Sequence, residues 1–568
     1  MPVSAAMCAR GRALSEPRLS PDGTTVAFLA RDANGTRLVA VPAHGGAELV
    51  LTTDPPPAFR GGVFDWAPDG RSIVFVTPWG DLCRIPAAGG TAEAVVADAG
   101  AAAVAVSPDG TRVAFAADDL ARIKVVDLRT GAVTTVAEDA DFCLDPVWSP
   151  EGTRLAWHEW DVPNMPWDES RIVVADLAAG THTAIAFPGA AVQQPRFSPD
   201  GTGLAFLCDE SGWLTLWVAD PDPRPLLDEP YEHGGPTFGP GQATYAWLPD
   251  GDMVVARNEA GFGRLVRVSD RAELGKGVHS ALTARADAIA CIRSGARTPT
   301  AVTVYRHEVR TPVARGPVGG FEALDLPEPK VVTVDGVHGR LYAPGADKPL
   351  LVWAHGGPTD QRRVEFDARL AFFLDRGWTV LFPDYRGSTG WGRAYAQALR
   401  GQWGKADADD VAAMATATSA EPGGWDPTRM ALMGGSAGGL TVLRLLADHP
   451  GLFRAAVALY PVCDLADLAA TTHRYEAHST HHLVGDHDEH VARSPLTYAA
   501  RITDPLLLLH GTDDVVVPAA QTRKLAAAVA GYVEHHEYEG EGHGWSKPAT
   551  TEDELTRISA FFDRFVLG

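Results

Sequence analysis

The sequence predicts an N-terminal β-propeller followed by a C-terminal domain in which a parallel sheet lies between layers of helices. Three observations support this prediction. A turn motif recurs through the first half of the chain, a linker-like stretch interrupts the pattern near the middle, and apolar strands then alternate with helix-forming segments. At 568 residues the chain is too long for a single hydrophobic core, so at least two domains are expected.

The recurring motif is an x-P-D/E-G turn that follows an apolar residue. Its six copies are at residues 19–23, 66–70, 106–110, 148–152, 197–201 and 247–251, and successive prolines lie 40 to 50 residues apart. In each copy one strand ends, the turn reverses the chain and a second strand returns. This period is that of a four-stranded propeller blade. Residues 286–310 have a strand pattern without the turn, so we predict a seventh blade there.

The second half of the chain has a different pattern. Residues 313–326 are rich in Pro, Arg and Gly, which is typical of a linker, and we therefore predict a propeller domain at 1–320 and a second domain at 321–568. After a hairpin at 330–334 and 339–342, strands are expected at 350–353, 379–382, 430–433, 455–459, 506–509 and 533–538. Helices are expected at 366–376, 408–419, 440–448 and 551–566. Such alternation predicts a parallel sheet with helices on both faces.

One strand of this domain runs into a turn that is typical of a nucleophile elbow. Residues 434–438 read G-x-S-x-G, with Ser436 between an apolar strand and a helix-forming segment. A serine hydroxyl is a weak nucleophile, and a sharp turn exposes its Oγ and points the next backbone N–H toward the substrate. Small residues are needed on both sides because larger side chains would clash with the neighbouring backbone. The non-catalytic alternative is a glycine-rich connection between strand and helix in which the serine has no function.

An acid and a histidine follow at the ends of two later strands. The loop 510–518 leaves an apolar strand and contains Asp513 and Asp514, either of which could orient an imidazole. The last strand is followed by a glycine-flanked histidine, His543, which we interpret as the general base. The chain has 19 His and 72 Asp and Glu, so each residue alone carries little weight. Their positions at successive strand ends predict an α/β-hydrolase fold.

An acyl-transfer site also needs donors for the oxyanion. A loop with the sequence H-G-G-P, residues 355–358, follows the strand at 350–353, and its glycine amides are unobstructed. We predict that the Gly357 N–H is one donor and the Ala437 N–H, directly after the serine, is the other.

Composition excludes several other classes of function. The formal net charge of −23 and the pI of about 5.2 argue against nucleic-acid and anionic-membrane partners, which would be repelled. The six cysteines show no zinc-type spacing and no disulfide framework, so no metal or cofactor is expected. No run of 18 apolar residues is present, and residues 1–19 lack the apolar segment of a signal peptide, so a cytoplasmic location is expected. The sequence leaves room for a homo-oligomer.

These motifs together resemble the prolyl oligopeptidase family of serine peptidases, in particular its bacterial dipeptidyl-aminopeptidase and acylaminoacyl-peptidase branch. The resemblance rests on residues 355–358, 384–392 (D-Y-R-G-S-T-G-W-G), 400–404, 434–439, 472–476, 511–518 and 539–544. It implies that Asp514, at the aspartate of G-x-x-D-x-x-V-P, is the triad acid. It further implies that Tyr460, Val516 and Val517 line an apolar S1 pocket, which would favour a hydrophobic P1 side chain.

The propeller half carries a weaker resemblance. Residues 157–168 resemble a W-x-x-W…P-x-M-P-W-D signature of the same branch. The resemblance makes Glu159, Glu210 and Glu232 candidates for binding a substrate ammonium, although each could equally lie on a solvated strand or turn. Arg171 stands where the branch has a glutamate, and a guanidinium there would suit a carboxylate or a blocked acyl group.

The sequence therefore predicts a serine hydrolase that cleaves short peptides or aminoacyl amides through an acyl-enzyme. An aminopeptidase is the favoured activity. The alternatives are an acylaminoacyl peptidase or other oligopeptidase, an esterase or amidase acting on a small metabolite, and a non-catalytic propeller-based interaction protein. The complete set of Ser, His, Asp and oxyanion donors argues against the last of these.

Overall fold

The computed structural model describes residues 2–53, 61–97, 99–220, 222–307, 309–316, 319–343, 345, 347–419 and 425–568. The chain divides into two compact units, Arg12–Gly316 and Met1–Gly11 together with Pro317–Gly568. The predicted division at residue 320 differs from this at both ends of the propeller. The first eleven residues join the second unit because helix α1 (Ala5–Ala9) packs against two of its helices, α2 (Ala368–Asp375) and α11 (Pro548–Phe562).

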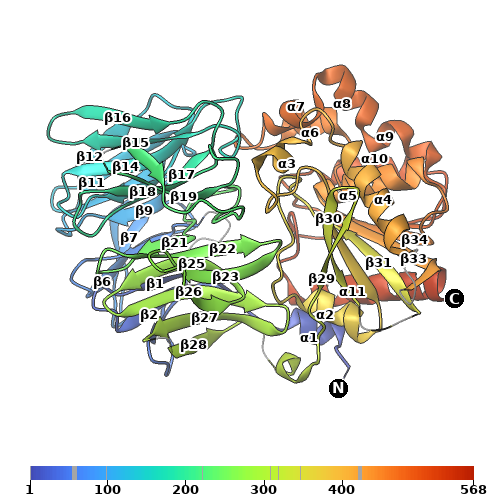
Figure 1. Ribbon diagram of the computed structural model, residues 1–568, viewed down its shortest axis with the longest axis horizontal. Coiled ribbons are helices and arrows are strands. Elements are labelled where there is room, and N and C mark those ends of the chain that lie inside the picture. Colours follow the sequence, from blue (N-terminus) through green and yellow to red (C-terminus); the bar gives the residue numbers. More distant parts are fainter. Residues whose placement is uncertain are drawn as a thin grey trace. The chain divides into compact units, whose positions relative to one another are not determined.

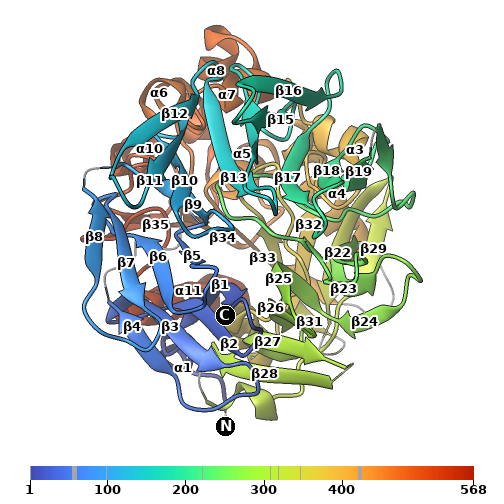
Figure 2. The same ribbon diagram turned by 90° about the vertical axis from the view of Figure 1, so that its left-hand side faces the viewer.

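The first unit is a propeller of seven four-stranded blades, each built from consecutive strands around a central axis (Figure 2), which confirms the predicted number. The strands of blades one to four are β1 (Ala13–Leu19), β2 (Thr25–Asp32), β3 (Gly35–Pro42), β4 (Leu49–Thr52); β5 (Phe64–Trp66), β6 (Ser72–Val76), β7 (Leu82–Pro86), β8 (Glu93–Val96); β9 (Ala102–Val106), β10 (Arg112–Ala117), β11 (Arg122–Asp127), β12 (Val133–Ala137); β13 (Phe142–Trp148), β14 (Arg154–Trp160), β15 (Arg171–Asp176) and β16 (Thr181–Ala186). Those of blades five to seven are β17 (Val192–Phe197), β18 (Leu204–Cys208), β19 (Thr215–Ala219), β20 (Pro223–Pro225); β21 (Tyr245–Trp247), β22 (Met253–Glu259), β23 (Phe262–Arg267), β24 (Glu273–Lys276); β25 (Val278–Arg285), β26 (Ala288–Gly295), β27 (Thr298–Arg306) and β28 (Val309–Arg315). The seventh blade thus begins earlier than the predicted segment 286–310.

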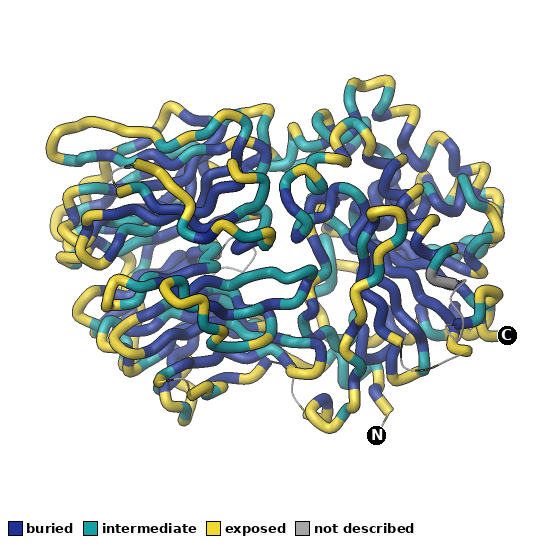
Figure 3. The backbone as a smooth tube through the Cα atoms, in the orientation of Figure 1, coloured by how far each residue is buried: buried dark blue, intermediate teal, exposed yellow. Residues whose placement is uncertain are grey.

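Burial decreases from the inner to the outer strands of a blade, because the outer edge faces solvent (Figure 3). In the fourth blade the second strand β14 is buried almost throughout, whereas the outermost strand β16 is exposed at nearly every position. The cores lie between neighbouring blades, where apolar faces of adjacent sheets meet. The first and seventh blades do not share a hydrogen-bonded sheet. They close the ring through one such apolar core and through Arg306 of β27, which donates to the carbonyl of Gly23 at 3.0 Å.

Tryptophans that precede the turn motif connect pairs of blades. Each donates its indole N–H to a backbone carbonyl of the preceding blade: Trp66 to Arg18 (3.0 Å), Trp148 to Ala105 (3.0 Å) and Trp247 to Arg196 (3.1 Å). The second, fourth and sixth blades are tied in this way to the first, third and fifth. The aromatic residue of the W-x-P-D/E-G motif therefore has a structural role between blades.

The second unit contains an eight-stranded sheet in the order β29-β30-β32-β31-β33-β34-β35-β36. Its strands are β29 (Lys330–Val334), β30 (Val337–Tyr342), β31 (Lys348–Ala354), β32 (Thr379–Asp384), β33 (Trp425–Gly435), β34 (Ala455–Leu459), β35 (Leu506–Gly511) and β36 (Val533–Tyr538). β29, β30 and β32 pair antiparallel, and from β32 to β36 the strands are parallel. This is the predicted hairpin followed by the predicted parallel sheet of an α/β-hydrolase.

Helices cover both faces of this sheet (Figure 1). Besides α1, α2 and α11 they are α3 (Arg393–Gln397), α4 (Ala406–Ser419), α5 (Ala437–Asp448), α6 (Leu465–Thr471), α7 (Ser479–Val484), α8 (His487–Arg493), α9 (Pro495–Tyr498) and α10 (Ala519–Ala528), with short turns at Phe321–Ala323, Ala499–Arg501 and Asp563–Leu567. Side chains of α4, α5 and α10 form one apolar core with Leu350 and Leu432 of the sheet. On the opposite face Trp353 of β31 contacts Phe373 of α2, with ring centroids 6.1 Å apart. Among the described residues, no helix is long and apolar enough to cross a membrane.

We expect Trp148→Phe to lower the free energy of unfolding of the propeller by about 1 kcal/mol, because the carbonyl of Ala105 loses a half-buried hydrogen bond. Trp79→Phe is the matched control, since Trp79 is 82% exposed on a turn. Urea unfolding followed by circular dichroism would measure both midpoints. Equal losses in the two variants would contradict the role given to the indole N–H.

Candidate active site

Ser436 lies at a sharp turn between a strand and a helix. β33 ends at Gly435 and α5 begins at Ala437, so the serine alone separates them, and the helix starts three residues earlier than predicted. The serine backbone has φ 56° and ψ −123°, a region that residues with a side chain rarely occupy. The surrounding structure therefore holds Ser436 in a strained conformation, as in a nucleophile elbow.

Glycines permit this turn because backbones approach one another closely around it. A Cβ built on Gly434 would lie 2.5 Å from the carbonyl oxygen of Gly438, and a Cβ on Gly438 would lie 2.5 Å from that of Ala354. A larger residue does not fit at either position. The same packing brings the H-G-G loop, which follows β31, beside the elbow, since a Cβ on Gly356 would lie 3.4 Å from the Cβ of Ser436.

Side chains from three strand ends form a continuous series of hydrogen bonds. His543 Nε2 lies 2.8 Å from Ser436 Oγ, and His543 Nδ1 lies 2.7 Å from Asp514 Oδ2. The serine follows β33, the aspartate follows β35 and the histidine follows β36, which meet at one edge of the sheet because these strands are parallel. In this geometry the imidazole can accept the serine proton while the carboxylate fixes its tautomer.

The Asp514 carboxylate is fully buried and saturated with donors. Its Oδ1 accepts the backbone N–H groups of Val516 and Val517, both at 2.9 Å, and Oδ2 faces His543. Burial alone would raise the pKa of Asp514, but hydrogen bonds from His510 and His543 outweigh burial and hold this pKa well below its usual range. The carboxylate therefore stays ionised beside the imidazole.

The neighbouring Asp513 has different surroundings. Its side chain is exposed and accepts a hydrogen bond from the hydroxyl of the adjacent Thr512 at 2.9 Å. Of the two carboxylates that the sequence left open, Asp514 is the one within reach of His543.

A second histidine, His510, contacts the loop that carries Asp514. It was not predicted from the sequence as a site residue. Its fully buried imidazole has Nε2 2.9 Å from the carbonyl of Val517 and 3.3 Å from Asp514 Oδ2, while Nδ1 lies 2.6 Å from Thr522 Oγ1. The imidazole thus holds the turn that carries the aspartate. The signal in the sequence was a polar residue at the buried end of an apolar strand.

Glu541 organises the loop that carries His543, and this residue was also missed. Its fully buried carboxylate accepts the N–H and hydroxyl of Ser546, at 2.7 and 2.6 Å, and the N–H of Lys547 at 2.9 Å. Its backbone carbonyl accepts the N–H of Asp513 at 2.9 Å. Burial would raise the pKa of Glu541, but these hydrogen bonds outweigh it and lower the pKa. Glu541 therefore fixes the histidine loop and links it to the acid loop.

The two predicted oxyanion donors flank the serine. Ala437 begins α5, and Gly357 belongs to the H-G-G loop that packs on the elbow. Neither N–H donates to an acceptor among the described residues. Both amides are therefore available to a ligand oxygen, as an oxyanion hole requires.

The D-Y-R-G-S motif, residues 384–388, supports the H-G-G loop. Tyr385 donates its hydroxyl to the carbonyl of His355 at 2.8 Å and stacks on the imidazole, and His355 Nε2 lies 2.7 Å from Ser388 Oγ. Burial lowers the pKa of His355, so the ring is neutral. Asp384, the first residue of the motif, forms a fully buried bidentate ion pair with Arg340 at 2.5 and 2.6 Å. The motif thus positions backbone rather than contributing a reacting group.

The predicted S1 residues are placed differently from one another. Tyr460 is partly buried, and its ring packs on His543 and on Trp545, with centroid distances of 4.7 and 5.3 Å. Val516 is partly exposed. Val517 is only 1% exposed because its side chain packs in the apolar core of the sheet. It therefore presents no side chain to a ligand, which corrects the expectation for it.

Two propeller residues proposed as substrate contacts bind each other instead. Glu159 is buried and accepts the indole N–H of Trp157 at 2.6 Å and the Arg171 guanidinium at 2.7 Å. The guanidinium also donates to Asp161 at 2.7 Å. Both charges are therefore neutralised within the blade, which corrects the expectation that Glu159 is free for an ammonium and Arg171 for a carboxylate.

The other two glutamates differ in exposure. Glu232 is only 5% exposed, and its backbone bridges to Asn258, so it is buried within the propeller. Glu210 lies exposed on the turn between β18 and β19. Glu210 thus remains as the accessible carboxylate of the three. Among the described residues, no group of three or more His, Cys, Asp or Glu could hold a metal ion.

We expect Glu541→Gln to lower kcat by as much as about a hundredfold with little change in KM, because the His543 loop loses its anionic acceptor and the imidazole shifts. Glu539→Gln is the matched control, since Glu539 lies exposed two residues earlier and uses only its backbone carbonyl, toward Lys547. Steady-state kinetics and near-UV circular dichroism would be measured on both. A fall in kcat of the same size in the control would refute the positioning role.

Known proteins resemble the second unit. Residues 364–567 match the family model described as the prolyl oligopeptidase family. The acylamino-acid-releasing enzyme of Arabidopsis thaliana is 28% identical over 235 residues, which cover 39% of this chain and 31% of that protein. Dipeptidyl aminopeptidase BIII of Pseudoxanthomonas mexicana is 31% identical over 216 residues, or 36% of this chain and 31% of that protein. The matched segment thus spans about a third of the length of each relative.

Solved structures match the whole chain. A puromycin-hydrolyzing peptidase of Mycobacterium tuberculosis aligns with a TM-score of 0.87 and 28% identity, covering 100% of this chain and 96% of that one. An acylaminoacyl peptidase of Pyrococcus horikoshii aligns with a TM-score of 0.77 over 100% and 98% of the two chains, and at 18% identity this likeness concerns the fold alone. The family match and the relatives agree that residues 364–567 are similar to the prolyl oligopeptidase family, and the solved structures share the fold of the whole chain.

Proposed function

We propose that this protein is a serine peptidase that cleaves short peptides or aminoacyl amides through an acyl-enzyme on Ser436. The observation that carries the proposal is the series of hydrogen bonds from Asp514 through His543 to Ser436, at 2.7 and 2.8 Å. The strained turn at the serine and the two adjacent unused amides support it further.

In the proposed mechanism His543 Nε2 accepts the hydroxyl proton as Ser436 Oγ attacks the scissile carbonyl carbon. Asp514 keeps the proton on Nδ1 and stabilises the imidazolium that forms. The N–H groups of Gly357 and Ala437 donate to the tetrahedral oxyanion. The intermediate collapses when His543 returns the proton to the leaving amine, which departs with the C-terminal part of the substrate. A water molecule, deprotonated by the same imidazole, then attacks the acyl-enzyme and releases the acid.

For the substrate we favour an aminopeptidase that removes residues from a free amino terminus. The names of the relatives support this choice, because they include a dipeptidyl aminopeptidase and a puromycin-hydrolyzing peptidase. A carboxylate is needed to bind the ammonium, and Glu210 is the accessible candidate on the propeller. Tyr460 and Val516 offer apolar surface near the triad, which favours a hydrophobic P1 side chain.

An acylaminoacyl peptidase is the second candidate. Two observations favour it: another relative is named an acylamino-acid-releasing enzyme, and the Glu159 carboxylate is already paired with Arg171. An esterase or amidase acting on a small metabolite would use the same triad. A non-catalytic interaction protein is disfavoured, because a strained serine in a complete triad would then have no use. The cytoplasmic location and a homo-oligomeric state remain predictions from the sequence.

The first prediction concerns the triad. Ser436→Ala and His543→Ala should each lower kcat/KM by about 10⁴-fold or more while leaving circular dichroism unchanged. Asp514→Asn should lower kcat by about 10⁴-fold, because the amide stabilises the wrong tautomer of His543. Asp513→Asn is the control and should have little effect, since its exposed carboxylate contacts only Thr512. Near-normal turnover by Ser436→Ala, or a reversed order of the two aspartates, would refute the assignment.

The second prediction concerns the substrate. Puromycin and leucyl or phenylalanyl p-nitroanilide should be hydrolysed faster than their N-acetylated counterparts, and hydrophobic residues faster than Asp or Lys. Glu210→Gln should raise KM for the free-amino substrates about tenfold and leave KM for the acetylated ones unchanged, because only the former lose an ion pair. Faster cleavage of the acetylated series would replace the aminopeptidase with an acylaminoacyl peptidase. Exclusive cleavage of p-nitrophenyl esters would point to the esterase.

A further inference from the structure

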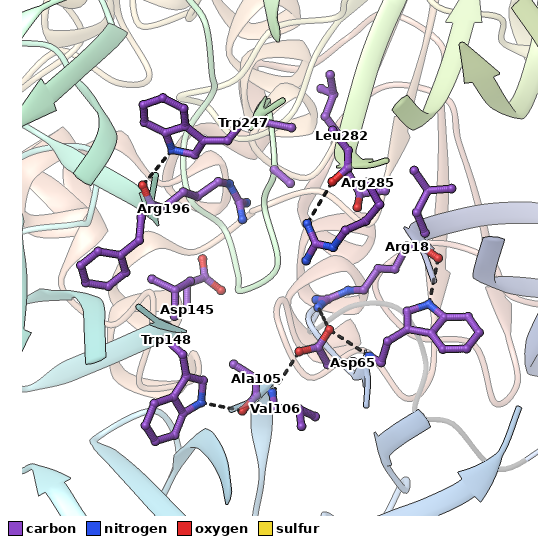
Figure 4. Close-up of a pocket in the computed structure, with 18 of the residues that line it drawn as sticks. Arg18, Asp65, Ala105, Val106, Asp145, Trp148, Arg196, Trp247, Leu282 and Arg285 are labelled. Carbon is purple, nitrogen blue, oxygen red and sulfur yellow. Dashed lines mark hydrogen bonds and ion pairs between the residues drawn. The ribbon is translucent and has the colours of Figure 1, made fainter. Parts of the chain in front are cut away.

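A cavity of about 630 Å³ lies on the central axis of the propeller. Its wall is made by the innermost strands of the blades and by the P-D/E-G turns, and it lies entirely within the first unit (Figure 4). This volume is in the range of small-molecule sites. Nothing in the proposed peptidase mechanism uses it.

The cavity is closed by backbone at one level of the axis. Seven lining residues with positive φ lie at or just before the first strand of a blade, one in each blade: Glu16, Gly62, Ala103, Asp145, Gln194, Gly241 and Ala281. The second and sixth blades are not neighbours in the ring, yet their backbones touch across it, since a Cβ built on Gly241 would lie 2.2 Å from Gly62 N. Asp145 of the fourth blade accepts the Gly241 N–H at 2.7 Å. The cavity therefore ends as a pocket at this level.

Charged side chains of both signs line this pocket. Arg18 and Asp65 form an ion pair at 3.1 Å. Arg196, Arg285 and Asp145 form no ion pair among the described residues, and Figure 4 shows the three charged groups around one shared space. Arg196 is half-buried and Arg285 is exposed, and both line this pocket in a chain whose formal net charge is −23.

Arg196 is the more deeply placed of the two cations. Its guanidinium lies over the ring of Tyr245, 5.6 Å from the centroid, and one Nη donates to the carbonyl of Gln242 at 3.0 Å. Its Nε is buried and has no hydrogen-bond partner among the described residues. Burial lowers the pKa of Arg196, which shows that the charged form is poorly solvated there. The charge of Asp145 favours the cation, although the two form no ion pair among the described residues, and a bound anion would offset the remaining cost of desolvation.

The carboxylates of the pocket show the complementary feature. Burial raises the pKa of Asp145 to about 6. Glu16 is 8% exposed. One of its oxygens accepts the Val63 N–H at 3.1 Å, and the other has no hydrogen-bond partner in the described part of the chain. A cationic group of a ligand would stabilise the ionised forms of these acids.

We propose that the propeller pocket binds a zwitterionic amino acid or short peptide. The ligand carboxylate lies between Arg196 and Arg285, and its ammonium lies against Asp145. The rings of Trp148 and Trp247, whose indole N–H groups are already used between blades, provide apolar wall for the ligand side chain. Because backbone closes the pocket, the ligand binds there rather than passing through. This inference is independent of the proposed peptidase activity.

The test uses the full chain with Ser436→Ala, so that no peptide is consumed, and equilibrium dialysis with radiolabelled glycyl-leucine. Unlabelled glycyl-leucine, N-acetylglycyl-leucine, glycyl-leucinamide and inorganic phosphate are the competitors. We expect the zwitterion to compete best, and the acetylated and amidated forms to compete about tenfold more weakly, because each lacks one ion pair. Strongest competition by phosphate, or equal competition by all four, would overturn the proposal.

Substitutions locate the bound peptide. Arg196→Met should weaken glycyl-leucine binding about tenfold or more. Arg154→Met is the matched control, because Arg154 also lies over an aromatic ring, Phe197, and donates to a carbonyl of the next blade but does not line the pocket. Asp145→Asn keeps an acceptor for the Gly241 N–H. It should weaken binding of glycyl-leucine to the level seen for N-acetylglycyl-leucine, and it should leave binding of the acetylated peptide unchanged.

Several outcomes with these variants would contradict the proposal. Unchanged binding in Arg196→Met, or equal weakening in Arg154→Met, would place the peptide elsewhere on the chain and overturn the proposal. If Arg196→Met does not fold, Asp145→Asn decides the matter, since it removes one charge and no packing atoms. Equal effects of Asp145→Asn on the zwitterion and the acetylated analogue would also overturn it.

Discussion

The catalytic unit depends on the close approach of three pieces of backbone around Ser436. The end of β31, the end of β33 and the first turn of α5 meet at distances that leave no room for a Cβ at Gly434 or Gly438. This packing sets the serine at a positive φ and places the H-G-G loop next to its amide. A strain of about 1–3 kcal/mol at one residue is tolerated because the apolar core of the sheet, which includes Leu432 and Leu443, fixes both flanking elements.

Two buried carboxylates, each of which accepts several hydrogen bonds, hold the loops that carry Asp514 and His543. Asp514 takes two backbone N–H groups and two imidazoles, and Glu541 takes two backbone N–H groups and a hydroxyl. In both cases the hydrogen bonds lower the pKa despite burial, so each carboxylate is ionised and accepts backbone hydrogen bonds from its own loop. The imidazole of His543 is thereby held between two fixed loops, which suits a group that must move a proton over a short distance.

The sequence predicted the blades, the sheet and the triad because each leaves a local pattern. A repeated turn reports a blade, and Ser436, Asp514 and His543 each follow a strand that is recognisable by composition alone. His510 and Glu541 were missed because their roles arise from contacts made across loops. The first eleven residues were misplaced for the same reason, since helix α1 joins the second unit through packing that no periodicity reveals.

Some charged side chains form ion pairs inside the protein and others do not, and the sequence alone does not distinguish between them. The sequence suggested that Glu159 and Arg171 both bind substrate. They lie instead at paired positions on adjacent strands and neutralise each other. Arg340 and Asp384 do the same. Arg196 forms no ion pair within the described part of the chain, and its Nε has no hydrogen-bond partner there, although it too is desolvated. Two charges that form an ion pair inside the protein stabilise each other, whereas a guanidinium without an ion pair is stabilised when an anion binds. The guanidinium of Arg196 is therefore a better indicator of a ligand site than a charge that is already paired.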